Sequence, residues 1–467
     1  MNVRGLDDEP SDDPCFADIA TLQSLFRSRA LSPVDLVRRF LDRIEQTEPV
    51  ISAYLAVDRS GALAAAGRAE ALYRDGNAPA LSGIPVAIKD TIDVAGLPTT
   101  NGSLSCPKIP KRRDAEVVRR LREAGAVILG KTNAHEFGLG GTTANALATT
   151  RNPWDPGRIA AGSSGGSAAA IAAGSAVLAL GGDAGGSIRA PAAWCGIAGL
   201  RPTRGLIPVD GALSVTPMDV LGPMARHSRD LLVAMRVLVR RNRRRWADRD
   251  GPSSAASAGQ RILVPYDLIG ALCDAEVIQR VLAAAEWYRA AGATVLPMTW
   301  PKDLLLDARR AAMTLTALSA ARRLGGRDRS LLGADVAAVI ERGDRMGPED
   351  EAWVWSVVER LQTLLERPVG GGDLVLTPVW PCDPPVVGGN IVTINARPCP
   401  YDEVRAIFTA PASLLGLPQH AFNVGFAKTG LPVGAQLMGA KGSDVDLLRL
   451  AVAFEEAHDY LDRRPHL

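Results

Sequence analysis

Two serines and one lysine in this chain have the residue types needed for acyl transfer without histidine. Ser163 lies in the segment G-S-S-G-G-S, and Ser187 ends the turn D-A-G-G-S, 24 residues further on. Lys89 follows an apolar, strand-like run, G-I-P-V-A-I. A serine hydroxyl is a good nucleophile only when a base removes its proton, and a lysine that burial keeps neutral can be that base. These residues predict a serine amidohydrolase.

The turn that ends at Ser187 has the composition of an anion-binding turn. The strand-like run Val177–Gly181 leads into it, and two glycines precede the serine. Glycines beside a nucleophile allow backbone N–H groups to approach a developing oxyanion. Asp183 and Arg189 flank the serine. We expect them to form an ion pair that braces the turn rather than to contact the substrate.

A second nucleophile has to be considered, because residues 162–166 also satisfy G-x-S-x-G. In an α/β-hydrolase this motif would make Ser164 the nucleophile. The late histidines that could serve as its base are His420, His458 and His466. This alternative leaves Lys89 and the turn at Ser187 unexplained, so we expect Ser164 to be a hydrogen-bonding neighbour of Ser163. A phosphate-binding loop is excluded, since no G-K-[ST] follows the glycines.

The lysine segment and both serine segments resemble the motifs of the amidase signature family. The other segments that carry this resemblance are Ala124–Phe137, Arg151–Trp154, Asp373–Pro378, Phe408–Pro418 and Gly430–Gly439. The match is dense from about residue 81 to residue 230 and weaker afterwards. The resemblance implies an α/β fold with a large mixed β-sheet surrounded by α-helices.

The resemblance also implies a role for each matching residue. Ser187 corresponds to the family's nucleophile, Ser163 to its bridging serine, which follows a cis peptide bond, and Lys89 to its general base. The oxyanion hole would consist of the backbone N–H groups of Ala184, Gly185, Gly186 and Ser187. The implied reaction is hydrolysis of a linear carboxamide through an acyl-enzyme, with neither a cofactor nor a metal.

Three positions depart from the family pattern. Ala184 stands where relatives usually have threonine, Ala161 stands where they usually have glycine, and Gln419-His420 begins a stretch that replaces an apolar one. We expect His420 to be a structural residue. These departures bear on which amide is bound rather than on the reaction. Substrate specificity is expected to depend on Gly138–Asn145, Asp210–Asp219 and residues 300–400.

Composition narrows the class of protein and its partners. An apolar content of 47% and a charged content of 22% are those of a globular protein, and a net charge of +2 argues against a nucleic-acid surface. The cysteines lack C-x-x-C spacing, so no zinc or redox motif follows. The acidic N-terminus is unlike a signal peptide, and the apolar run Ala168–Leu180 is shorter than a membrane span. We expect a cytoplasmic enzyme whose partner is a small amide, without nucleic acid or membrane; a homodimer stays open.

Helical and strand-like patterns alternate along the chain. Residues 16–29, 32–48 and 59–74 have helical spacing and predict an N-terminal helical segment, 1–75, packed on a catalytic domain, 76–467. The strands expected next are 84–88, 126–129 and 177–180, and the helices are 114–124, with Asp114 as N-cap, and 167–173. Residues 241–259 are predicted to be a linker, and residues 300–370 to be mainly helical without an interpretable motif.

Two other functions share these motifs. One is that of the glutaminase-like subunit of a tRNA-dependent amidotransferase, which would deliver ammonia to partner subunits. The other is a catalytically silent binding protein on the same fold. Hydrolysis by the purified chain alone would exclude the silent protein and argue against a partner-dependent subunit, and labelling by a serine-directed probe would argue against silence.

Overall fold

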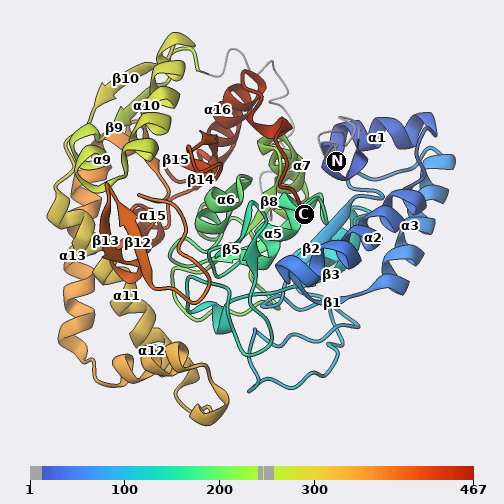
Figure 1. The fold of residues 1–467 in the computed structure, drawn as a ribbon, viewed down its shortest axis with the longest axis horizontal. Coiled ribbons are helices and arrows are strands. Elements are labelled where there is room, and N and C mark those ends of the chain that lie inside the picture. Colours follow the sequence, from blue (N-terminus) through green and yellow to red (C-terminus); the bar gives the residue numbers. More distant parts are fainter. Residues whose placement is uncertain (1–12, 240–245, 247–256) are drawn as a thin grey trace, which may run out of the picture.

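An eleven-stranded mixed β-sheet runs through the computed structural model, which describes residues 13–239, 246 and 257–467 (Figure 1). The strand order is β1-β3-β2-β6-β8-β7-β14-β15-β11-β9-β10. The strands are β1 (Tyr54–Val57), β2 (Pro85–Lys89), β3 (Val127–Thr132), β6 (Leu178–Asp183), β7 (Ala198–Arg201), β8 (Val220–Ala225), β9 (Arg261–Val264), β10 (Thr294–Pro297), β11 (Leu374–Pro378), β14 (Gln419–Phe426) and β15 (Pro432–Met438). Neighbours are parallel along β3-β2-β6 and β11-β9-β10 and antiparallel elsewhere. The expected large mixed sheet is confirmed.

Helices surround this sheet and bury its central strands. The α-helices are α1 (Ile19–Ser28), α2 (Pro33–Ile51), α3 (Arg59–Arg74), α4 (Glu116–Glu123), α5 (Gly165–Ala172), α6 (Arg189–Cys195), α7 (Ser228–Leu238), α9 (Tyr266–Leu272), α10 (Ala275–Ala290), α11 (Lys302–Leu324), α12 (Ala334–Asp344), α13 (Pro348–Gly370), α14 (Tyr401–Val404), α15 (Ala410–Leu415) and α16 (Asp444–Glu456). Strands β2, β8, β14 and β15 are buried at every position. Because both faces are covered, β2 and β8 form near-continuous apolar runs in the sequence, whereas β14 buries the polar side chains of Gln419, His420 and Asn423.

Short elements complete the described chain. Two small hairpin sheets pair β4 (Arg151–Asn152) with β5 (Asp155–Ile159) and β12 (Ile391–Ile394) with β13 (Arg397–Pro400). The 3₁₀-helices are η1 (Pro14–Phe16), η2 (Glu136–Gly138), η4 (Arg329–Leu331) and η5 (Tyr460–Asp462). No helix in the described ranges has the length and apolarity needed to cross a membrane.

The N-terminal segment contributes to the central sheet as well as to its cover. Its three predicted helices are present as α1, α2 and α3, and Ser32 caps α2 by accepting a hydrogen bond from the Val34 N–H. Strand β1, which the helical pattern did not predict, pairs with β3 at the edge of the sheet. Apolar residues of these helices belong to the same core cluster as β2, β3 and β6. The domain boundary near residue 75 stays a prediction.

The predicted cap of α4 is wrong. The helix begins at Glu116, and its N-cap is Ala115, without a side-chain cap. The Asp114 carboxylate instead accepts a hydrogen bond from the Ala95 N–H at 2.8 Å and pairs with Arg122 at 3.1 Å. A tertiary contact and an ion pair therefore occupy the side chain that the local pattern assigned to capping.

The C-terminal half forms a second apolar cluster at the other end of the sheet. Helices α9, α10, α11 and α13 pack there against β9, β11 and β15, away from α1–α3 (Figure 1). The mainly helical content predicted for residues 300–370 is confirmed by α11, α12 and α13. The linker predicted at 241–259 lies outside the described residues, apart from Trp246 and residues 257–259.

Candidate active site

Parallel pairing of β2 with β6 brings the lysine and the serine turn together. Ile88 lies opposite Leu180 in this pairing, so the carboxyl ends of both strands meet at one edge of the sheet. Lys89 is the last residue of β2, and the turn to Ser187 follows the last residue of β6. Ser163 directly precedes Ser164, the N-cap residue of α5. The carboxyl edge of parallel strands is where open α/β sheets usually bind ligands.

The Lys89 side chain is buried and bonded to Ser163. Its Nζ lies 2.7 Å from Ser163 Oγ and 3.5 Å from the Gly182 carbonyl oxygen. Burial lowers the pKa of Lys89 to about 8, although the negative charges of Asp219 and Asp183 raise it. With a pKa of about 8, about a tenth of the lysine is neutral at pH 7. The site therefore contains an amine that can accept a proton.

Ser163 and Ser187 line one small cavity with Lys89. The peptide bond between Gly162 and Ser163 is cis, as the family resemblance implied. The cavity is also lined by Asp219, whose carboxylate accepts hydrogen bonds from backbone N–H groups. Among the hydrogen bonds of the described residues, none joins the two serine hydroxyls. Catalytic hydrogen bonds are often long before substrate binds, so this geometry remains compatible with a relay.

The turn at Ser187 is braced by the buried carboxylate of Asp183. This carboxylate accepts hydrogen bonds from the N–H groups of Gly186 and Ile188 at 2.9 and 3.1 Å. It pairs with Arg189 at 2.8 Å and with Arg201 at 3.0 Å. Burial alone would raise the pKa of Asp183, but the two guanidinium groups hold it well below its usual value. The expected pair of Asp183 with Arg189 is confirmed; Arg201, which sequence reasoning missed, is a second partner.

The backbone donors of this turn are only partly free. The Gly186 N–H, one of the four donors expected in an oxyanion hole, is occupied by the Asp183 carboxylate. The N–H groups of Ala184, Gly185 and Ser187 donate to no other described residue. Gly186 has φ +132°, and a Cβ there would lie 2.6 Å from the Thr409 hydroxyl. Only glycine fits this position.

The α/β-hydrolase alternative is not supported by the surroundings of Ser164. Its hydroxyl is buried and bonds the backbone of Gly182, at 3.2 Å to the carbonyl oxygen and 3.3 Å to the nitrogen. His420 instead bonds Ser228 and the Gly199 carbonyl, and burial lowers its pKa to about 3. The expectation of a structural histidine at position 420 is confirmed. Ser164 is a hydrogen-bonding neighbour of the strand that leads to Ser187.

The structure shows the surroundings of the three departures from the family pattern. Ala161 has φ +62°, a left-handed conformation that favours glycine. The amide oxygen of Gln419 accepts a hydrogen bond from Arg189 and so joins the buried network behind the turn. Ala184, the third departure, lines the cavity shared with Lys89.

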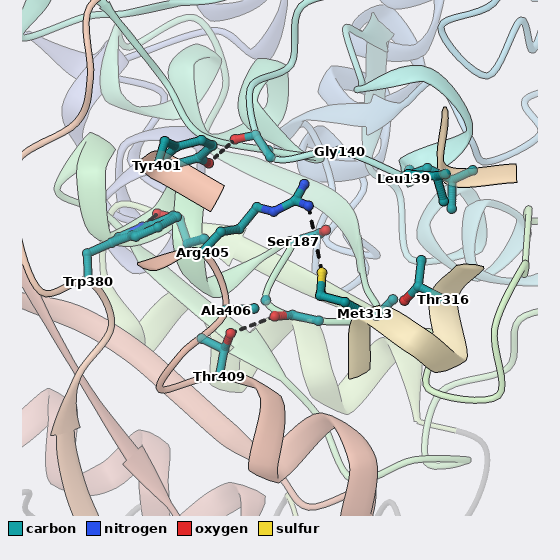
Figure 2. A pocket seen from close by; sticks show the side chains of 18 of the residues that line it. Leu139, Gly140, Ser187, Met313, Thr316, Trp380, Tyr401, Arg405, Ala406 and Thr409 are labelled. Carbon is teal, nitrogen blue, oxygen red and sulfur yellow. Dashed lines mark hydrogen bonds between the residues drawn. The ribbon is translucent and has the colours of Figure 1, made fainter. Parts of the chain in front are cut away.

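A second, adjoining pocket opens beside Ser187 (Figure 2). Its wall includes the loop Gly138–Gly141, and the Tyr401 hydroxyl donates to the Gly141 carbonyl oxygen at 2.8 Å. Trp380 stacks on Trp194 with ring centroids 3.9 Å apart. The other lining side chains come mainly from α11, α12 and the segment around α14 and are Met313, Thr316, Val339, Arg342, Arg405 and Thr409. Sequence reasoning missed these as individual residues: Thr409 lies in the resembling segment Phe408–Pro418, and the others lie in no segment that carries the resemblance.

The described residues include no cluster of three or more His, Cys, Asp or Glu side chains that could hold a metal ion. The ionisable groups that line the cavity around Lys89 are Lys89 itself and Asp219. The arrangement therefore offers an amine, two hydroxyls and free backbone donors as its chemical groups.

Known proteins are similar to this chain in both sequence and fold. The model of the family described as Amidase matches residues 35–448. The chain belongs to the amidase signature family. A glutamyl-tRNA(Gln) amidotransferase subunit from Desulforudis audaxviator is 34% identical, with 95% of this chain and 96% of that protein covered.

Solved structures of other amidase signature proteins superpose on this chain. A crystal structure of an amidase aligns with a TM-score of 0.85 at 30% identity, covering 94% of this chain and all of that one. The corresponding glutamyl-tRNA(Gln) amidotransferase subunit from Thermotoga maritima aligns with a TM-score of 0.75 at 26% identity, covering 98% and 97%. Both comparisons confirm the fold.

Proposed function

We propose that this chain is an amidohydrolase that cleaves the C–N bond of linear carboxamides. The observation that supports this most directly is the 2.7 Å contact between Lys89 Nζ and Ser163 Oγ, in a buried cavity that Ser187 also lines. A lysine that no described carboxylate contacts by a hydrogen bond, and whose pKa burial lowers to about 8, is suited to be a base.

The proposed reaction begins with attack of Ser187 Oγ on the amide carbonyl carbon. The Ser187 proton passes to Ser163 Oγ while the Ser163 proton passes to Lys89 Nζ. The oxyanion accepts hydrogen bonds from the free N–H groups of the turn, those of Ala184, Gly185 and Ser187. Because Asp183 holds the same turn through the N–H groups of Gly186 and Ile188, these donors need not reorganise when the charge develops.

Collapse of the tetrahedral intermediate breaks the C–N bond. Lys89 and Ser163 return a proton to the leaving nitrogen, and the amine departs. Water then attacks the acyl-enzyme, giving its proton to the same relay, and Ser187 is regenerated with release of the acid. These steps use neither a cofactor nor a metal.

The test is covalent labelling of the nucleophile. A fluorophosphonate probe is expected to label Ser187, and Ser187→Ala is expected to lower turnover by on the order of 10⁴-fold or more. Ser164→Ala is the matched control, since Ser164 is a neighbouring serine bonded to Gly182; it should still be labelled at Ser187. Labelling at Ser164 would overturn the assignment and restore the α/β-hydrolase alternative.

A second candidate function is that of an amidotransferase subunit. It is favoured by the 34% identity with a glutamyl-tRNA(Gln) amidotransferase subunit over nearly the whole chain. The higher TM-score with the amidase, 0.85 against 0.75, favours the hydrolase instead. Ammonia release from simple amides by the isolated chain would support the hydrolase. Release only from glutamine, and only with partner subunits added, would support the amidotransferase.

A catalytically silent binding protein is the third possibility. It would retain the fold but would react with no serine-directed probe. Absence of labelling in folded protein would support it and would contradict both enzymatic functions.

A further inference from the structure

Arginines gather at the pocket beside Ser187, and the Asp402 carboxylate that pairs with one of them lies outside the described pocket lining. Arg342 and Arg405 line this pocket, and Arg309 donates a hydrogen bond to the carbonyl oxygen of Arg405 at 3.1 Å. No Asp or Glu is found among the described residues that line the pocket. The described ion pairs include none with Arg309 or Arg342. The described pocket lining therefore carries the two positive charges of Arg342 and Arg405, and the acidic side chains that act on these arginines, such as Asp402, lie outside that lining.

Arg405 is the central member of this group. Its side chain extends from the loop after α14 into the pocket toward Ser187 and Met313 (Figure 2). Its Nε is buried and has no hydrogen-bond partner among the described residues, and one terminal nitrogen contacts the Met313 sulfur, at 3.7 Å. Its ion pair with Asp402, at 3.4 Å, involves a carboxylate that is 77% exposed. A buried guanidinium nitrogen normally has an acceptor, and a sulfur contact with one exposed carboxylate leaves the terminal nitrogens of Arg405 with donors for a further acceptor.

Arg342 places a second cation at the same pocket. One of its terminal nitrogens donates to the Met313 carbonyl oxygen at 3.1 Å, which holds the side chain near Arg405. Partial burial and the neighbouring charge of Arg405 lower the pKa of Arg342, against the negative charge of Asp402, which raises it. Two like charges at one pocket repel each other, and an anion bound between them would remove that repulsion.

We propose that the pocket binds a carboxylate of the substrate through Arg405, assisted by Arg342, so that the enzyme acts on small amides that carry a carboxylate group. This inference rests on the proposed function, because it places the carboxylate relative to Ser187. A guanidinium presents donors in a planar fork that matches both carboxylate oxygens. Trp380 and Tyr401 supply an apolar wall for the carbon chain between the carboxylate and the amide.

The first experiment compares isosteric substrates. Succinamate and 4-methylpentanamide have nearly the same shape, but only succinamate is charged; malonamate and glutaramate vary the chain length. Wild-type protein is expected to show a higher kcat/KM for at least one of the charged amides. Arg405→Gln is expected to lower the charged-to-neutral ratio of kcat/KM by on the order of tenfold to a hundredfold, and Arg342→Gln by less.

The matched control is Arg345→Gln. Arg345 is the exposed C-cap residue of α12, three residues beyond Arg342, and does not line the pocket. Its replacement removes the same charge from the same helix end and should leave the ratio unchanged. Arg405→Lys keeps the charge but not the planar fork, and should retain part of the preference. If Arg345→Gln and Arg405→Gln lower the charged-to-neutral ratio of kcat/KM equally, the preference depends on overall charge rather than on a binding site, and the inference is overturned.

Binding without turnover separates this inference from the proposed chemistry. The Ser187→Ala variant is titrated calorimetrically with malonamate, succinamate and glutaramate, and the titration is repeated on the double variant that also carries Arg405→Gln. Binding that is present in the single variant and lost in the double one supports the carboxylate site even if no amide is hydrolysed. If Ser187 is labelled and neutral amides are hydrolysed, but no charged amide binds, the carboxylate site is wrong and the amidohydrolase stands.

Discussion

The Nζ atom of Lys89 and the Oγ atom of Ser163 lie 2.7 Å apart, and both side chains are almost fully buried. Burial disfavours the charged form of a lysine, which is why the pKa of Lys89 is lowered to about 8. The proposed proton relay from Ser187 runs through this contact, and its final acceptor, the Lys89 amine, is therefore partly neutral.

This relationship predicts a pH dependence of the reaction. Only neutral Lys89 accepts a proton, so kcat/KM should fall about tenfold per pH unit below pH 8 and level off above it. Initial rates between about pH 6 and about pH 10 measure this profile. Lys89→Ala should remove the activity, with partial rescue by small amines; Lys89→Arg should be inactive and not rescued, since arginine stays charged. Near-normal turnover of Lys89→Arg with an unchanged profile would exclude lysine as the base.

The charge of Asp219 should influence the pH below which kcat/KM falls, here called the acid limb of the profile. Its carboxylate accepts N–H bonds from Val215 and Thr216, and its negative charge raises the pKa of Lys89. Asp219→Asn keeps the shape and one acceptor oxygen but removes the charge. The pKa of Lys89 should therefore fall, and the acid limb of kcat/KM should move to lower pH. Asp210→Asn, an exposed control in the same segment, should not move it; a limb that moves to higher pH in Asp219→Asn would contradict the assignment.

Gly186 should tolerate no side chain, whereas Gly185 should. A Cβ at position 186 would lie 2.6 Å from the Thr409 hydroxyl on a backbone with φ +132°, but one at position 185 has Met313 Cε at 3.8 Å as its nearest neighbour. Gly186→Ala should lower the free energy of unfolding by about 1–3 kcal/mol, through overpacking and backbone strain. Gly185→Ala should change it far less. Urea denaturation of both variants measures the difference, and equal stabilities would show that the turn is not held as described.

Arg189 should matter for stability more than a surface arginine does. Arg189→Met removes one of two guanidinium groups that neutralise the buried Asp183, so the free energy of unfolding should fall by about 3–5 kcal/mol. Arg322→Met breaks a solvent-exposed pair with Glu351 and should cost much less. Thermal and urea unfolding of the two variants give the comparison. A similar loss in both would mean that the Asp183 network does not brace the turn.

Local sequence was sufficient for the features that depend on short stretches of chain. Helix α3 begins and ends where its spacing predicts, and β2 is displaced by one residue from the predicted strand. Lys89 at the end of an apolar run, and glycines before Ser187, are informative because strand burial and tight turns are encoded within a few residues. The family resemblance added the roles of these residues and the cis bond before Ser163.

Contacts between distant segments could not be predicted in the same way. Arg189 donates to the Thr409 carbonyl, 220 residues away, and Arg405 enters a pocket whose other walls include residues 138–141, α11 and α12. Asp114 had a local cap signal, but the tertiary structure assigned its carboxylate to Ala95 and Arg122. The sequence by itself determined the groups proposed to react and the turn that holds one of them. Only the tertiary structure decided which charges surround them, because burial and neighbouring charge depend on segments that meet only after folding.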